Sequence, residues 1–233
     1  MGPGVSTRAK STRMGKLHDQ IARTLLPGMR IPEPIRLLFD WIEANGTYVD
    51  NAKGERIGFL FPENEMKRGW TDTERPGGTN IEFFAEGNVN MKYWFRHEKP
   101  EVLERLCVFA KTGAEGSMAA FWLDDAGRQK IVHLGSGSGS TLVCVLAENP
   151  VDFLRLIAIG YDEICWSEDF SRPASQADGF LVHPHTQFRD WVSRTFQVTI
   201  PGTASEIVKH PSLMGDAEPK DEFARWVDHH TQG

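Results

Sequence analysis

The feature that most constrains the fold is a run of strand and turn signals within residues 102–166. Ser117–Leu123 (SMAAFWL) and Lys130–Leu134 (KIVHL) are short apolar segments with aromatic or β-branched residues, which predicts two strands. Asp124–Gly127 (DDAG) lies between them and suits a hairpin turn. Thr141–Leu146 (TLVCVL) predicts a third strand. This order favours one compact unit of strands followed by a helix.

The helix is predicted by the clearest start signal in the chain. Asn149 can cap a helix, Pro150 fits the first helical position, and Asp152 lies near the positive end of the helix dipole. A wide apolar stripe then runs through Phe153, Leu154, Ile157, Ala158, Tyr161 and Ile164. We expect this helix to extend to about Cys165, despite Gly160 near its end.

The N-terminal half adds two helices and several short strands. Helices are expected over residues 17–26 and from about residue 35 to Gly46, where apolar residues recur at helical spacing. Four segments are predicted as strands: 47–49, 57–61, Ile81–Phe84 and Met91–Phe95. Gly87 and Asn88 favour a hairpin between the last two. Residues 62–80 are polar and contain Pro76, Gly77 and Gly78, which indicates a long loop.

The C-terminal part is predicted to be mainly helical. A helix should start near Thr186, a short one near Thr203–Val208, and a last one should carry Phe223, Trp226 and Val227. The fold class is therefore α+β, a mostly antiparallel sheet packed against helices, with extra N- and C-terminal helices. We expect three parts: a basic, partly disordered arm at 1–30, a domain at 31–182, and a C-terminal extension packed on it at 183–233.

Composition and charge narrow the classes of partner. The chain is 40% hydrophobic and 25% charged, and no apolar run is long enough to span a bilayer. Residues 1–30 carry six basic residues against one acidic residue, a net +5, so a total of −6 leaves −11 on the remainder. An acidic body disfavours nucleic-acid binding and favours a basic partner. Neither nucleic acid nor membrane is an expected partner.

The cysteines and the N-terminus indicate the compartment. Cys107, Cys144 and Cys165 are an odd number of thiols among apolar neighbours, which does not suggest a disulfide framework and fits a reducing environment. The basic N-terminus lacks the apolar segment of a secretory signal. We therefore expect a cytoplasmic protein.

A glycine-serine run, Gly135–Ser140 (GSGSGS), is the first candidate for chemistry. A phosphate-binding loop or a dinucleotide fingerprint requires a helix after the glycines, but a predicted strand follows this run. A nucleophile elbow requires a serine with glycines two residues away on each side, and Gly137 occupies that position. The run is therefore interpreted as a structural loop, with no catalytic residue and no cofactor site.

Histidines and carboxylates supply the remaining candidates. His183 and His185 alternate, so in an extended segment both could bind a metal, although Pro184 favours a loop and no third ligand is evident. A metal-dependent hydrolase using this pair is an alternative hypothesis. The adjacent carboxylates are typical of turns and solvated surfaces and do not suggest a paired catalytic site; they are Asp124/Asp125, Asp162/Glu163 and Glu168/Asp169.

The order of motifs in residues 106–161 resembles the SUKH superfamily. That superfamily includes a yeast cell-wall-synthesis regulator and many bacterial immunity proteins of polymorphic toxin systems. The residues that carry the resemblance are Phe109, Ala110, Gly113 and Gly116, then Phe121–Asp124, then Leu134–Ser136, and finally Asp152, Phe153 and Leu154.

The resemblance implies an α+β sheet flanked by helices and a protein that acts without catalysis. It implies binding and neutralisation of a cognate toxin, so the expected partner is a protein. A general scaffold or regulator, as in the eukaryotic relatives, is a further alternative. The sequence predicts neither the partner-binding residues nor the oligomeric state.

Overall fold

The computed structural model describes residues 15–62, 65, 74–176 and 181–231. Its centre is a 7-stranded antiparallel sheet of order β1-β2-β4-β5-β6-β7-β8. Its strands are β1 (Tyr48–Asp50), β2 (Arg56–Phe59), β4 (Glu82–Gly87), β5 (Leu106–Lys111), β6 (Met118–Leu123), β7 (Gln129–Leu134) and β8 (Val143–Ala147). The α+β fold predicted from the sequence is confirmed.

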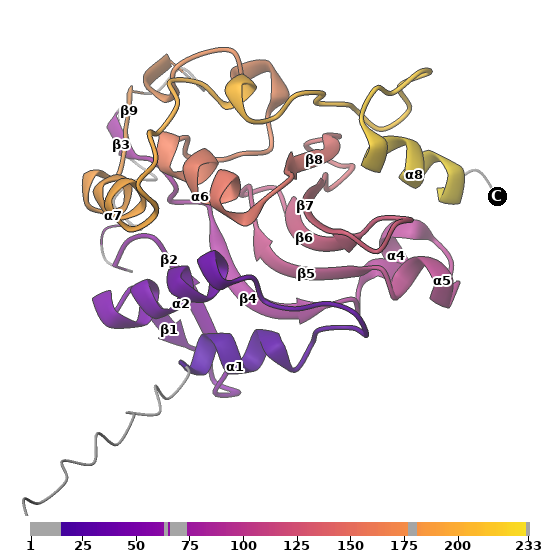
Figure 1. Ribbon diagram of the computed structural model, residues 1–233, viewed down its shortest axis with the longest axis horizontal. Helices are drawn as coiled ribbons and strands as arrows, with labels where there is room; N and C mark the ends of the chain where they lie inside the picture. The colour runs from indigo at the N-terminus through magenta and orange to yellow at the C-terminus, as the bar shows by residue number, and fades with distance from the viewer. Residues whose placement is uncertain (1–14, 63–64, 66–73, 177–180, 232–233) are drawn as a thin grey trace, which may run out of the picture.

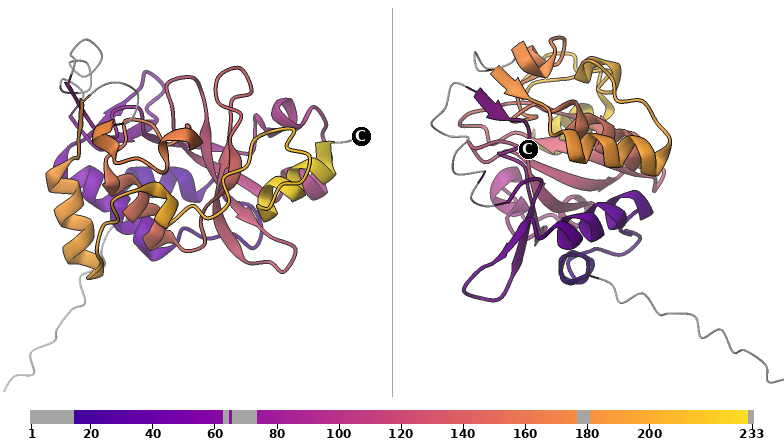
Figure 2. Two further views of the ribbon diagram at one scale, coloured as in Figure 1. Left: turned by 90° about the horizontal axis from the view of Figure 1, so that it is seen from above. Right: turned by 90° about the vertical axis from the view of Figure 1, so that its left-hand side faces the viewer.

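Helices cover both faces of this sheet, which gives the molecule three layers (Figure 1; Figure 2). The first face packs against α1 (Lys16–Ala22), α2 (Glu33–Asn45) and α6 (Pro150–Ile159), and α7 (Thr186–Phe196) packs on α6. The second face packs against α4 (Met91–Phe95), α5 (Pro100–Leu103) and α8 (Glu222–Thr231). Short 3-10 turns lie at Ser167–Asp169, Ala174–Gln176 and Ala204–Glu206.

Strand alternation divides the apolar residues between two cores. On β6, Ala119 and Phe121 join the core of the first face, whereas Ala120 and Trp122 join the core of the second. Because helices cover both faces, the central strands are apolar on both sides, which explains the continuous run AAFW at Ala119–Trp122.

The helix predicted to run to Cys165 ends earlier, so that prediction is wrong in length. Its start is confirmed, because Asn149 Oδ1 accepts a hydrogen bond from the amide of Asp152 at 3.0 Å. The helix stops at Gly160, whose φ of 102° is left-handed. The apolar residues beyond it, Tyr161 and Ile164, are buried in irregular backbone. Their spacing reflects burial and not a further helical turn.

Met91–Phe95 forms helix α4, so the predicted hairpin with β4 is wrong. The segment MKYWF satisfies both periods, since Met91, Tyr93 and Phe95 alternate while Met91 and Phe95 are also four residues apart. Met91 and Phe95 are buried on the second face, whereas Tyr93 is 70% exposed. A strand would have placed all three on one side. Gly87, at φ 68°, ends β4 before the helix.

Segments near both ends of the described chain pack onto the rest of the fold. In the predicted N-terminal arm, Leu17 and Ile21 of α1 are fully buried; residues 1–14 of that arm lie outside the described residues. Toward the C-terminus, the segment 212–221 covers the outer edge of β8. Ser212 O accepts from Val143 N, and Thr141 O accepts from Met214 N, each at 2.8 Å. These hydrogen bonds pair backbone groups that the edge strand would otherwise expose.

A 2-stranded parallel sheet pairs β3 (Glu74–Pro76) with β9 (Leu181–His183). Strand β3 lies within the predicted loop at 62–80, part of which falls outside the described residues. At Gly77 this sheet packs directly against the end of α6, because a Cβ built there would lie 1.8 Å from Gly160 O. Only glycine allows this close approach.

Candidate functional site

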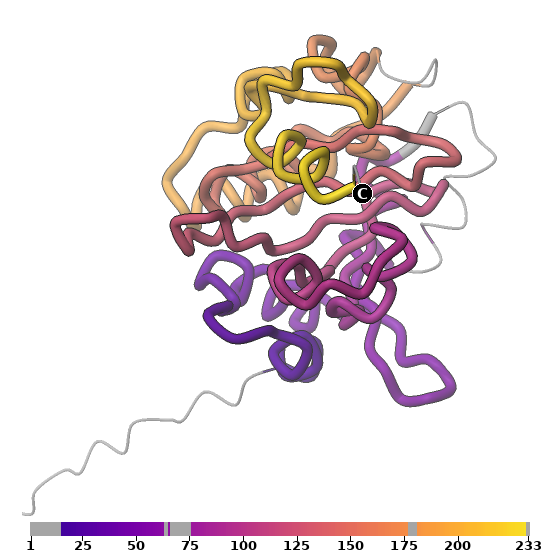
Figure 3. Tube along the Cα trace, turned by 90° about the vertical axis from the view of Figure 1, so that its right-hand side faces the viewer, coloured from indigo at the N-terminus to yellow at the C-terminus, as the bar shows by residue number. Residues whose placement is uncertain are grey.

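The second face of the sheet carries an open groove between α4 and α8. Its volume is about 630 Å³. Figure 3 shows α8, in yellow, beside the magenta segment that contains α4. One wall is formed by residues 93–97 and Lys99 and the other by α8, and residues 213–215 and the β7–β8 loop complete the lining. We call this hollow the α4–α8 groove.

Exposed apolar side chains gather at this groove. Among the described residues, the exposed large hydrophobic side chains are Val89, Tyr93, Leu181 and Leu213. Tyr93 and Leu213, 70% and 43% exposed, line the groove, and Val89 lies in the turn that leads into α4. Covering such side chains with a partner removes apolar surface from water, which favours binding.

The groove floor is rigid because its aromatic side chains are packed and hydrogen-bonded. Trp94 Nε1 donates to Gly135 O at 2.8 Å, so α4 is fixed to the glycine-rich loop. Phe95 packs edge-on against Trp226 of α8, with ring centroids 5.9 Å apart. A pre-formed apolar surface loses little conformational entropy when a partner binds.

His97 connects the two walls. Its Nε2 donates to His230 O at 3.1 Å, while Nδ1 accepts from the amide of Lys99 at 3.2 Å, which requires the tautomer protonated at Nε2. The C-terminal end of α8 is thereby held to the turn that follows α4.

Two cations stand at the mouth of the groove. Arg96 and Lys99 are exposed and line it. Within the described part of the chain, neither side chain forms a hydrogen bond or an ion pair. Asp228 is the one carboxylate among the described lining residues, and burial together with Asp216 raises its pKa.

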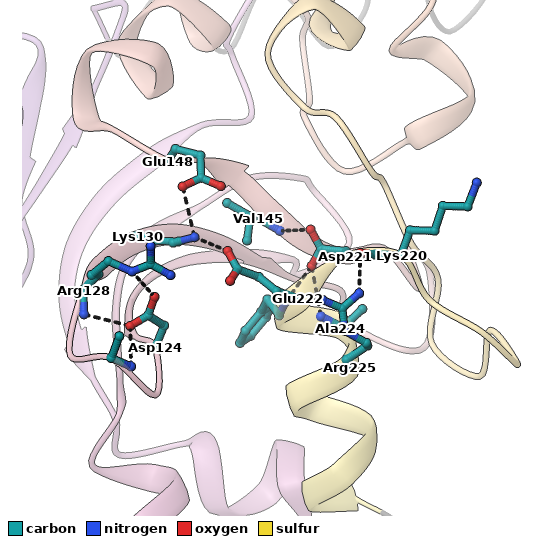
Figure 4. A network of polar contacts seen from close by, with 12 residues as sticks. Asp124, Arg128, Lys130, Val145, Glu148, Lys220, Asp221, Glu222, Ala224 and Arg225 are labelled. Carbon is teal, nitrogen blue, oxygen red and sulfur yellow. Dashed lines mark hydrogen bonds and ion pairs between the residues drawn. The ribbon is translucent and has the colours of Figure 1, made fainter.

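A polar network fixes α8 to the sheet (Figure 4). Asp221 caps α8 by accepting from the amides of Phe223 and Ala224, and it also accepts from the amide of Val145 on β8 at 3.0 Å. Lys130 on β7 forms an ion pair with Glu222 and another with Glu148, the latter at 3.0 Å. These contacts hold one groove wall in position.

His185 has both ring nitrogens engaged. Nδ1 accepts from the amide of Phe188 at 3.3 Å and so caps α7, and Nε2 donates to Leu60 O at 2.9 Å. Its ring stacks on Phe61 with centroids 4.0 Å apart, and burial lowers its pKa. His183 lies in β9, paired in register with Pro76. In the described part of the chain no three His, Cys, Asp or Glu side chains are grouped to hold a metal.

The glycine-serine loop uses two of its serine hydroxyls to bond backbone groups. Ser140 Oγ donates to Cys165 O at 2.6 Å, and Ser136 Oγ accepts from the amide of Gly139 at 3.0 Å. A Cβ at Gly135 would lie 2.6 Å from Ser140 O, so the tight β7–β8 connection requires glycine there. These contacts give the run a structural role.

Several carboxylates expected on the solvated surface are buried, so that prediction is wrong for Asp124, Asp162 and Asp169. Asp124 accepts from the amides of Ala126 and Arg128 within its turn. Asp162 accepts from Thr79 N at 3.2 Å and Asn80 Nδ2 at 3.0 Å, which fixes the segment before β4. The cysteines are buried too, and desolvation raises the pKa of each thiol.

The groove residues were not identified from the sequence. Tyr93 lies in the segment Met91–Phe95, which the alternation of apolar residues predicts as a strand. The available signal was the four-residue spacing of Met91 and Phe95, which predicts a helix and places Tyr93 outward.

No family model matches this chain, and comparison with the curated proteins and with the solved structures found no match. The described helices include none with the length and apolar character to cross a membrane.

Proposed function

We propose that this chain is a non-catalytic protein-binding module, an immunity protein that neutralises a cognate bacterial toxin in the cytoplasm by binding it through the α4–α8 groove. The motif order that resembles the SUKH superfamily supports the class of protein. The buried, unpaired cysteines are compatible with a reducing compartment.

The observation that carries the proposal is the gathering of exposed apolar side chains at one rigid groove. Tyr93 projects from a helix whose neighbouring residues, Trp94 and Phe95, are fixed by a hydrogen bond and by ring packing. Its exposure therefore does not come from a loosely held helix. Exposed aromatic side chains on a pre-formed surface are the residues that most often dominate binding energy at protein interfaces.

The proposal is tested by co-expression with the toxin encoded in the adjacent gene. The wild-type chain should restore growth and should bind the purified toxin. The variants Tyr93→Glu and Leu213→Glu introduce an unpaired charge at the interface, and each should weaken binding at least tenfold, since 1.4 kcal/mol corresponds to a factor of about ten.

Leu181→Glu is the matched control, because Leu181 is 44% exposed but lies on β9 and not among the groove residues. It should bind and protect like the wild type. The proposal fails if the wild-type chain neither binds nor protects against the neighbouring toxin, or if all three variants behave alike. Specific recovery of several unrelated partners would instead favour a general scaffold.

A further inference from the structure

We infer that the partner segment received by the α4–α8 groove is acidic: a stretch of protein that presents a large apolar side chain flanked by carboxylates. The inference rests on the proposed docking function and adds the chemistry of the partner. It reverses the expectation from net charge alone, which favoured a basic partner.

The charge at the groove differs in sign from that of the chain. The chain as a whole carries a net −6, yet Arg96 and Lys99 both line the groove and are exposed. Other cations nearby are partly buried and neutralised, as Lys92 is by Glu98 at 3.2 Å and Arg105 by Asp125 at 2.6 Å. Arg96 and Lys99 have no such partner among the described residues. They are therefore available to pair with carboxylates of another molecule.

The backbone conformation of Arg96 is a second observation in favour of a binding role for its side chain. Arg96 ends α4 with φ 59°, in the left-handed region that glycine enters without steric cost. A non-glycine residue there is disfavoured by about 1 kcal/mol. Within the described part of the chain the guanidinium forms no hydrogen bond or ion pair, so no intramolecular polar contact offsets this backbone cost.

Asp228 limits where the carboxylates can lie. It lines the α8 wall, and burial together with the charge of Asp216 raises its pKa. A carboxylate bound near Asp228 would be repelled, so the acidic groups of the partner should face the α4 wall and its apolar side chain should lie toward Tyr93 and Leu213.

Other occupants fit less well. Nucleic acid would need an array of cations to neutralise successive phosphates, and an acidic chain repels it. The chain's own N-terminal residues contain Arg8, Lys10 and Arg13, which have the wrong sign. A protein segment with carboxylates satisfies both the charge and the apolar surface.

The test uses three fluorescein-labelled peptides of about 12 residues that share a Leu-Trp-Leu centre and differ in flanking Glu, Gln or Lys. Fluorescence anisotropy measures their binding to the full chain. The Glu peptide should bind about tenfold more tightly than the Gln peptide, and the Lys peptide should bind most weakly. Raising the salt concentration should reduce these differences.

Variants separate the charge from the apolar contact. Arg96→Glu combined with Lys99→Glu should reverse the order of the three peptides, whereas Tyr93→Ala should weaken all of them. Arg23→Glu combined with Lys53→Glu makes the same change in net charge at exposed residues outside the groove, and it should leave the order unchanged.

Two results would overturn the inference in different ways. Equal affinity for the three peptides, with all binding lost in Tyr93→Ala, would refute the acidic partner while supporting the docking site. Absence of binding at up to about 1 mM peptide, or binding that Tyr93→Ala does not change, would refute both.

Discussion

The two faces of the sheet differ in how completely the helices cover them. On the first face, backbone atoms come into close contact at the end of α6: Gly77 approaches Gly160, and Gly160 approaches Pro184. Even its polar groups, such as His133, are buried with hydrogen-bond partners. On the second face the core is packed under α8, but between α4 and α8 a groove remains in which Tyr93 and Leu213 are exposed.

Under the proposed function, this difference separates the residues that stabilise the fold from those that bind a partner. Close-packed residues tolerate little change in volume, since any added atom displaces its neighbours. Residues that project into solvent can change at small cost to folding, because they contribute few contacts to the native state. We therefore expect substitutions on the first face to act on the free energy of unfolding, and substitutions in the groove to act on binding.

The largest effect on stability is expected at Gly77. In Gly77→Ala the added Cβ would meet Gly160 O at 1.8 Å, so the β3–β9 sheet and the end of α6 must separate. We expect a loss of about 3 kcal/mol in the free energy of unfolding, measured by chemical denaturation. Gly202→Ala is the control, because the nearest atom to its Cβ is a Glu206 side-chain oxygen at 3.7 Å. Equal losses in the two variants would contradict the close packing at Gly77.

A second effect on the first face depends on pH. His133 bonds to Thr112 Oγ1 and to Leu142 O, each at 2.9 Å, and burial lowers its pKa to about 4. The unfolded chain, with a histidine pKa of about 6.5, takes up the proton first, so stability is lost as pH falls from about 6.5 toward 4.

We therefore expect the wild type to lose about 2 kcal/mol more than His133→Gln between about pH 7.5 and pH 5, in denaturation curves recorded at both values. The comparison uses the change with pH within each protein, so any constant cost of the substitution cancels. Parallel pH profiles for the two proteins would show that His133 is not buried as a neutral group.

Sequence patterns predicted the elements whose signals are local. Asn149 and Pro150 gave the start of α6, and the β6–β7 hairpin follows from the DDAG turn and the apolar segments on either side of it. Gly46 ends α2 with φ 68°, as its position after the apolar repeat predicts. Each of these signals is contained within a few residues, where capping and turn preferences decide the conformation.

The remainder depends on contacts between distant residues. The β3–β9 pairing joins strands more than a hundred residues apart, and no local pattern specifies it. Asp162 is buried against Thr79 and Asn80, which are more than eighty residues earlier in the sequence. The groove was missed for the same reason, since its walls come from α4 and α8 and its exposed tyrosine belonged to a segment compatible with both strand and helix.

The smallest effect on stability is expected at Tyr93, and it is the sharpest contrast with Gly77. Tyr93 is 70% exposed on α4, and alanine is a better helix former than tyrosine, so Tyr93→Ala should change the free energy of unfolding by less than about 0.5 kcal/mol. Phe95→Ala, two residues away but 3% exposed against Trp226, should cost about 3 kcal/mol. If Tyr93→Ala destabilised the protein as much as Phe95→Ala does, Tyr93 would belong to the core, and its exposure could no longer be assigned to recognition.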